Sequence, residues 1–207
     1  LAQRVAAQLR GAEVRAGRPG AVFVGSNGNK TTIQLTELRE MPGIDAIEVD
    51  VARIEGERQA LLDTITARIQ HAHDAGHTSV IYTSRTEKTF ADQATRLAFG
   101  TAVSAFLMDV VRGLPATLGF LISKGGITSN DVLSTGLALP AARVLGQILP
   151  GCSVVRCPDD HPRHAGMPVV IFPGNVGDNL ALARAWARLA GAPAPGTPSA
   201  HPQAASQ

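Results

Sequence analysis

The sequence of 207 residues has few aromatic residues, only two cysteines and no long apolar run. Aromatic residues make up 4% of the chain, which argues against the stacking platforms that bind single-stranded nucleic acid. Two cysteines exclude a disulfide framework and favour a reducing, cytoplasmic location. The longest uncharged apolar stretch, 97–108, is too short to cross a bilayer as a helix, and no signal peptide is visible. We therefore expect no membrane partner.

The charge of the chain is small and evenly spread. The formal net charge is +2, and most of the basic residues are scattered arginines. Nucleic-acid-binding domains concentrate such residues in a patch or stripe, so we expect no nucleic-acid partner. Hydrophobic residues make up 44% and charged residues 17%, as in an ordinary globular protein with one core.

Short apolar runs alternate with helix-like segments along the chain. We expect strands at 21–24, 44–51, 79–82, 116–122 and 168–172, and helices at 30–40, 56–75, 91–112, 128–139 and 179–190. Strands that alternate with helices imply crossover connections and parallel pairing. The predicted fold class is α/β, a mostly parallel sheet with helices on both faces, in three layers.

A parallel sheet places all its strand-to-helix turns at one edge. The turns at Ser26, Ser84, Gly125 and Gly174 should therefore converge there, and open α/β sheets bind their ligands at this edge. Ser84 is expected to serve its own turn rather than a ligand. Ser26 either contacts a ligand or bonds the turn backbone.

Two of these turns have the composition of phosphate-binding loops. Glycine lets phosphate oxygens approach the backbone N–H groups, and a helix start adds a positive field. One turn is 124–129, Lys-Gly-Gly-Ile-Thr-Ser, in which the backbone of Gly125 and Gly126 and the hydroxyls of Thr128 and Ser129 would hold phosphates. The other turn, 172–178, is Phe-Pro-Gly-Asn-Val-Gly-Asp. Either turn alone is also typical of a plain helix start.

Two common nucleotide motifs are absent. Lys30-Thr31 is preceded by Asn29 rather than by the glycine that a Walker loop requires. No Gly-x-Gly-x-x-Gly follows the first predicted strand, which argues against a dehydrogenase-like dinucleotide fold.

The run 122–131, followed at a distance by 172–178, resembles the four-carbon acid sugar kinase family. The segment 22–26 is similar to that family's first nucleotide-contacting turn. The resemblance implies an ATP-dependent kinase that phosphorylates threonate, erythronate or a 3-oxo-tetronate at its terminal hydroxyl, with Mg²⁺ as the expected metal. The residues then expected to contact the nucleotide are Ser26, Gly125, Gly126, Ile127, Thr128, Ser129, Gly174, Asn175 and Gly177.

The same resemblance implies a domain layout. Members carry an N-terminal domain that binds the sugar acid through an Asp-Asp-x-Thr-Gly signature, and this sequence has no such signature. We therefore expect residues 1–20 to be a linker helix from a missing sugar-acid domain and 21–191 to be the nucleotide-binding domain. The chain starts with Leu1, which suggests a piece of a longer protein. A disordered tail is expected at 192–207.

Several alternatives stay open. Asp178 is either a helix-capping carboxylate or a catalytic group that contacts magnesium or orients the acceptor hydroxyl. The cluster Cys152, Cys157, His161 and His164 has ligand types that suit zinc, but its spacing matches no common zinc pattern, so we expect no metal site there. The domain could also be a non-catalytic regulatory module that binds a nucleotide or sugar phosphate. A homodimer is compatible with the sequence.

Overall fold

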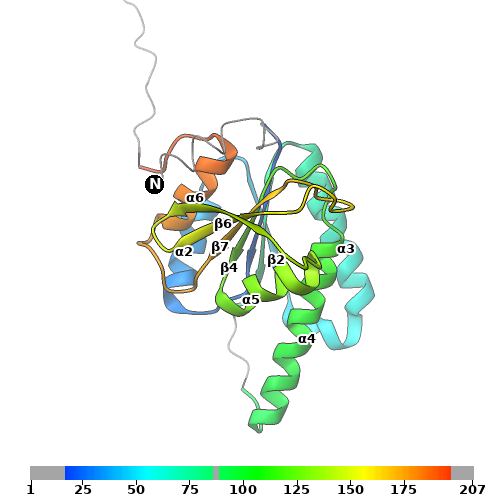
Figure 1. The fold of residues 1–207 in the computed structure, drawn as a ribbon. Helices are drawn as coiled ribbons and strands as arrows, with labels where there is room; N and C mark the ends of the chain where they lie inside the picture. The colour runs from blue at the N-terminus through cyan, green and yellow to red at the C-terminus, as the bar shows by residue number, and fades with distance from the viewer. Residues whose placement is uncertain (1–16, 86–88, 197–207) are drawn as a thin grey trace, which may run out of the picture.

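The structure, a computed structural model, describes residues 17–85 and 89–196. Its centre is a seven-stranded sheet in the order β2-β3-β1-β4-β7-β6-β5 (Figure 1). The first five of these strands run parallel, and β6 and β5 complete the sheet by antiparallel pairing. The strands are β1 Ala21–Val24, β2 Ile44–Val49, β3 Thr78–Thr83, β4 Leu121–Lys124, β5 Arg143–Leu149, β6 Cys152–Arg156 and β7 Pro168–Phe172.

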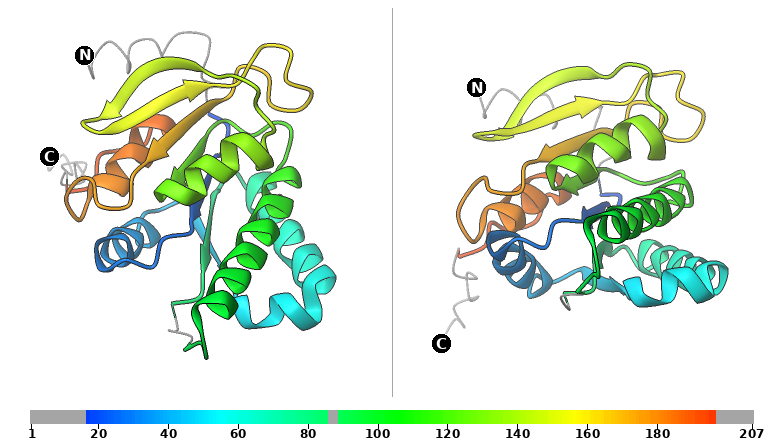
Figure 2. Two further views of the ribbon diagram at one scale, coloured as in Figure 1. Left: turned by 60° about the horizontal axis from the view of Figure 1, so that its bottom comes forward. Right: turned by 90° about the horizontal axis from the view of Figure 1, so that it is seen from below.

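Helices cover both faces of this sheet, as Figure 2 shows. Helices α2 and α6 pack on one face, and α3, α4 and the short α5 lie on the other. The predicted fold class is thus confirmed. The helices are α2 Asn29–Arg39, α3 Ile54–Asp74, α4 Gln93–Arg112, α5 Gly126–Asp131 and α6 Ala181–Ala190, with a 3-10 turn η1 at Val51–Arg53 and a π turn η2 at Val132–Gly136.

Strand β1, which lies inside the sheet between β3 and β4, shows why the fold has two cores. Its four residues are all buried, and successive side chains of a strand point to opposite faces. Val22 and Val24 therefore join the core under α2 and α6, whereas Ala21 and Phe23 join the core under α3 and α4. A strand buried on both faces needs a continuous apolar run, and this requirement made β1 easy to predict.

The hairpin of β5 and β6 was missed by the sequence analysis, which assigned no element between residues 140 and 167. Its two strands are joined at Pro150-Gly151, and Gly151 has a φ of +78°. A Pro-Gly pair between two apolar runs is a turn signal that could have indicated the hairpin.

Two predicted elements have different bounds. The strand expected at 116–122 is only β4 Leu121–Lys124, because the preceding residues form a turn in which the Leu118 N–H donates to the Pro115 carbonyl at 3.1 Å. The helix expected at 128–139 begins at Gly126 and passes into the π turn η2. Predictions for residues 1–16 and 197–207 lie outside the described residues.

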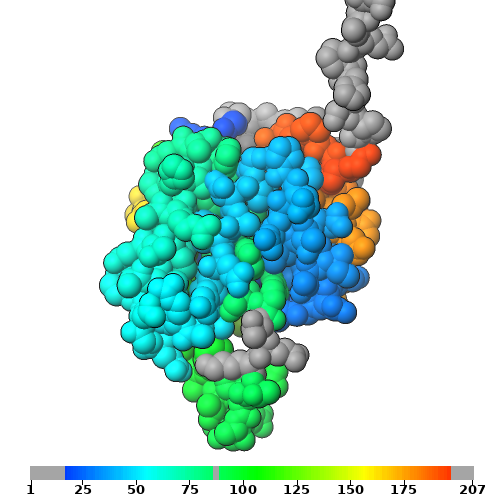
Figure 3. All heavy atoms as spheres, turned by 180° about the vertical axis from the view of Figure 1, so that it is seen from behind, coloured from blue at the N-terminus to red at the C-terminus, as the bar shows by residue number. Residues whose placement is uncertain are grey.

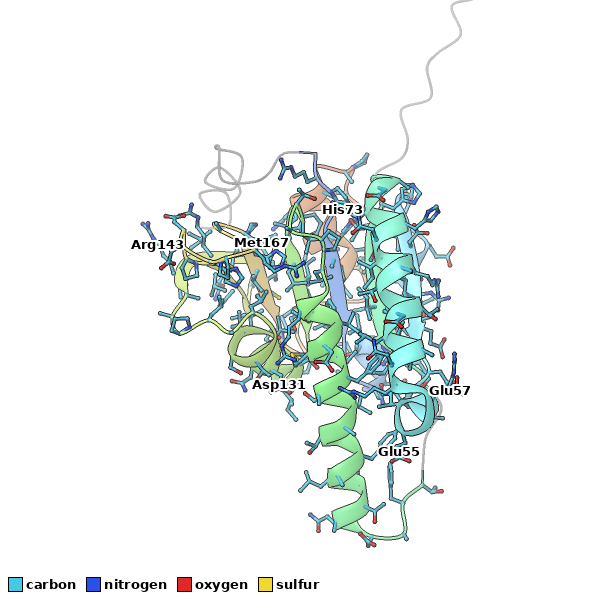
Figure 4. The ribbon with its side chains drawn as sticks, turned by 90° about the vertical axis from the view of Figure 1, so that its right-hand side faces the viewer. Glu55, Glu57, His73, Asp131, Arg143 and Met167 are labelled. Carbon is cyan, nitrogen blue, oxygen red and sulfur yellow. The ribbon has the colours of Figure 1, made fainter. Side chains whose placement is uncertain are left out.

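Helix α4 is only half embedded in the molecule. Phe106 to Val111 lie in the core, while the first half of the helix is largely exposed and projects beyond the body (Figures 1 and 3). Ser104 contacts Asp131 of α5, on the flank of α4 seen in Figure 4. Among the described residues, α4 is the one helix long and apolar enough to span a membrane by length and composition alone. Core helices of globular proteins commonly meet the same criterion.

Candidate functional site

The turns after β1, β4 and β7 lie side by side at the carboxyl edge of the sheet. Their strands are neighbours, and Val24, Lys124 and Phe172 stand in register at the strand ends. The convergence expected of the Gly125 and Gly174 turns is therefore present in the structure.

The chain leaves neighbouring strands toward opposite faces at this edge. Helix α2, which follows β1, packs on one face, whereas α5, which follows β4, leads to the other. Helix α6, which follows β7, returns to the face of α2. In open α/β sheets, ligands bind where neighbouring connections diverge in this way.

The first turn, after β1, and the second turn, after β4, are in direct contact; the third turn is the one after β7. The Gly25 N–H donates to the Lys124 carbonyl at 3.4 Å, and a Cβ added to Gly25 would lie 2.1 Å from the Thr128 hydroxyl oxygen. Gly125 has a φ of +120°, a conformation that residues with a side chain rarely adopt. Glycine at both positions therefore allows the two turns to approach each other.

The third turn packs against the other two. The Gly125 N–H donates to the Phe172 carbonyl at 2.8 Å. The Thr31 hydroxyl lies 3.3 Å from both the Ser26 hydroxyl and the Gly174 carbonyl oxygen, and thereby joins the first turn to the third. These contacts make one continuous backbone surface from three separate loops.

Side chains of α2 and β4 donate hydrogen bonds to the carbonyl groups of the third turn. Lys124 Nζ donates to the Pro173 and Gly174 carbonyls at 2.8 Å each. Lys30 Nζ lies 3.3 Å from the Asn175 carbonyl and 3.1 Å from the Gly177 carbonyl. The Gln34 side-chain amide donates to the Val176 and Asp178 carbonyls at 3.0 and 2.7 Å. All six carbonyl groups from Pro173 to Asp178 thus accept a side-chain hydrogen bond.

Converging glycine turns of this kind suit a phosphorylated ligand, and comparison with known families agrees. A model of the family described as the nucleotide-binding C-terminal domain matches residues 21–182. The chain belongs to this family. No curated protein sequence gives a significant match.

Solved structures share the fold of this nucleotide-binding domain. A domain of unknown function from Bordetella bronchiseptica, crystallised with citrate as a domain-swapped dimer, superposes with a TM-score of 0.66 at 20% identity over 87% of this chain and 44% of that one. A Salmonella typhimurium LT2 protein, provisionally named a tRNA synthase, gives a TM-score of 0.61 at 21% identity over 83% and 40% of the two chains. The chain therefore spans less than half the length of these proteins, and identities this low show the fold alone.

Gly126 and Ile127 are the most open positions in the three turns of the nucleotide-binding domain. A Cβ added to Gly126 would have no atom within 4 Å. The Ile127 side chain is 80% exposed. Asn175 and Gly177 are also exposed, in the third turn. These positions leave the backbone accessible from solvent.

Two predicted site residues are engaged elsewhere. Ser129 is buried, and its hydroxyl donates to the Ser123 carbonyl at 2.9 Å, so it does not present a hydroxyl to a phosphate as expected. The Asp178 carboxylate accepts from the Leu180 N–H at 3.1 Å and from Arg184, which lowers the pKa of that carboxyl. Asp178 lies two residues before Leu180, the N-cap of α6, so its carboxylate stabilises the turn that leads into this helix.

Sequence reasoning missed several residues at this edge. The sequence analysis assigned no site role to three residues of α2, Lys30, Thr31 and Gln34. The Lys-Thr pair lacks the glycine of a Walker loop, but its place after a glycine turn could have indicated a site. Arg85 was also missed: its Nη1 donates to the Ser26 carbonyl at 2.5 Å and to the Asn27 side chain at 3.1 Å. The Ser84 hydroxyl does not bond its own turn as expected: it accepts from the Val51 N–H of the neighbouring η1 turn, after β2, at 3.3 Å.

The described residues offer no protein-held metal site. They contain no group of three or more histidine, cysteine, aspartate or glutamate side chains placed to hold an ion. In the Cys152 to His164 segment, His161 instead contacts the Leu137 carbonyl at 2.9 Å. The Asp178 carboxylate is paired with Arg184, and a magnesium ion would fit here as a companion of nucleotide phosphates, which is the way this ion usually binds.

Proposed function

We propose that this domain binds ATP on the three converging turns and serves a kinase that phosphorylates a four-carbon sugar acid at its terminal hydroxyl. Threonate, erythronate and 3-oxo-tetronates are the candidate acceptors. The observation that carries the proposal is the contact of the Gly25, Gly125 and Gly174 turns at one edge, within a nucleotide-binding family. The resemblance of 122–131 and 172–178 to the four-carbon acid sugar kinases supports the choice of acceptor.

Backbone groups would bind the phosphates. The N–H groups at the start of α5 and in the third turn are accessible, and transfer of a phosphoryl group depends mainly on positioning and neutralisation of charge. Lys30 and Lys124 supply positive charge next to these turns. When bound, Mg²⁺ would neutralise part of the phosphate charge.

We place the binding site of the acceptor in another part of the protein. The chain spans less than half the length of the solved structures that share its fold. We propose residues 21–191 as the nucleotide-binding domain, joined through 1–20 to a sugar-acid domain. The kinase would be cytoplasmic.

A phosphorylation screen tests this function. The full-length protein is incubated with Mg·ATP and each of threonate, erythronate and their 3-oxo forms, and ADP release is coupled to NADH oxidation. We expect turnover with at least one four-carbon acid, and none from this chain alone, because we place the acceptor site in the sugar-acid domain. Absence of turnover with all of them, despite ATP binding, would refute the kinase assignment.

A non-catalytic regulatory module is the second candidate. The Asp178–Arg184 ion pair favours it, because it lowers the pKa of the one carboxyl group in the third turn and so makes that group a weaker base. In that case the full-length protein would bind a nucleotide or sugar phosphate and transfer no phosphoryl group.

A further inference from the structure

Two of the chain's three lysines direct their ammonium groups at the Pro173–Asp178 turn. Lys124 is the more unusual, because its side chain is fully buried at the end of β4. Its Nζ lies 2.8 Å from each of two carbonyl oxygens and 4.5 Å from the centre of the Phe172 ring. A buried ammonium group is costly unless it is bonded, and the two carbonyl oxygens offset that cost.

The geometry of the peptide unit shows what these bonds do. In a planar trans peptide, the C=O of one residue and the N–H of the next point in opposite directions. The described residues contain no cis peptide. Since all six carbonyls from Pro173 to Asp178 are directed at side chains of α2 and β4, the N–H groups of residues 174–179 point away from them.

These N–H groups are available for a ligand. Within residues 17–85 and 89–196, none of the six from 174 to 179 donates a hydrogen bond to another residue; the Asp178 N–H interacts with its own carboxylate. Successive free N–H groups in a turn form an anion-binding surface. Its orientation is set before any ligand arrives, which lowers the ordering cost of binding.

We propose that Lys124 is a positioning residue of the nucleotide site: its buried ammonium group holds the Pro173–Asp178 turn by two carbonyl oxygens, so that the opposite N–H groups face the nucleotide phosphates. Loss of the Lys124 proton removes a positive charge beside the phosphates and so weakens nucleotide binding. This inference rests on the proposal that the nucleotide is bound at the three turns.

The surroundings of Lys124 make that proton loss accessible. Burial lowers the pKa of Lys124 from 10.5 to about 8, Lys30 of α2 acts in the same direction, and Cys152 of β6 opposes it. Burial raises the pKa of the Cys152 thiol to about 11, so that thiol is neutral at pH 8. An anionic ligand favours the protonated amine, so binding should take up a proton.

Calorimetry of this chain with the magnesium complex of β,γ-imido-ATP tests the proposal. Titrations at pH 7, 8 and 9, each in two buffers of different ionisation enthalpy, give both the affinity and the protons taken up. For the wild type, we expect uptake of about half a proton at pH 8 and a loss of affinity of up to about tenfold between pH 7 and 9, from a pKa of about 8.

Two variants separate this role from a merely structural one. Lys124→Met should bind the analogue more weakly at pH 7 and lose the proton uptake. The difference in proton uptake between wild type and this variant also removes any contribution of the chain's α-amino group, which both share. Lys30→Met removes the other ammonium group at the same turn but keeps the buried amine, so proton uptake should persist, shifted toward higher pH because Lys30 lowers the Lys124 pKa. Thermal melting checks that each variant is folded.

The outcomes are distinct. Equal affinity and equal proton uptake for wild type and Lys124→Met would overturn the role of Lys124 while leaving ATP binding intact. A wild type that takes up no proton would overturn it without reference to any variant. A wild type that does not bind the analogue at all would overturn both the proposed function and this inference.

Discussion

Replacement of Gly126 by valine should abolish tight nucleotide binding without harming the fold. Gly126 is the first residue of α5, its φ is not positive, and an added Cβ would meet no atom within 4 Å. Valine is a somewhat better helix residue than glycine, so the free energy of unfolding should change by less than about 0.5 kcal/mol. The branched side chain would instead occupy space next to the backbone N–H groups that the phosphates need.

The expected loss of affinity follows from those hydrogen bonds. One or two N–H contacts to a charged phosphate contribute about 1–3 kcal/mol in total, which corresponds to about 5- to 150-fold in Kd. Calorimetry with Mg·β,γ-imido-ATP measures this change, and urea denaturation measures the stability.

Gly100→Val is the matched control. Gly100 lies on the projecting half of α4, and a Cβ there would also meet no atom within 4 Å. It should leave Kd unchanged. An unchanged Kd for Gly126→Val, or an equal loss in the two variants, would refute the placement of the phosphates at this turn.

Three further predictions follow from the site. Gly25→Ala should lower the free energy of unfolding by about 1–3 kcal/mol in urea denaturation, because its Cβ would lie 2.1 Å from the Thr128 hydroxyl oxygen. A second change, Thr128→Ala, should recover part of this loss. Asp178→Asn in the full-length protein should keep kcat within about threefold, because the Asp178 carboxylate bonds the Leu180 N–H and Arg184 in the turn before α6; a loss of about 100-fold or more would identify it as the catalytic base. The pKa of Lys124 is lowered to about 8 in the folded state from 10.5, so the unfolded chain holds more protons between these pH values. The contribution of Lys124 to the free energy of unfolding should therefore rise as pH increases from about 8 to 10.5. A Lys124→Met variant whose melting temperature rises equally over this range would contradict this.

The sequence determined the fold class because its signals are local. The apolar run at 21–24 needed burial on both faces, and the helical spacing of Leu61, Ile65 and Ile69 in α3 matched the buried face that the structure shows. The order of strands and helices then implied that the turns at Gly125 and Gly174 share one edge. The Bordetella and Salmonella proteins share this fold at 20% and 21% identity, which shows how little of the remaining sequence the fold requires.

Only the tertiary structure decided which side chains serve the site. Ser129 has the composition of a phosphate ligand, yet it bonds Ser123, and Lys124 lies inside the protein rather than at its surface. Gln34 and Lys30 matter because α2 packs beside a turn more than 140 residues further along the chain. Helix and strand patterns arise from neighbours in sequence, whereas the direction of a hydroxyl or an ammonium group depends on partners that the chain brings together only on folding.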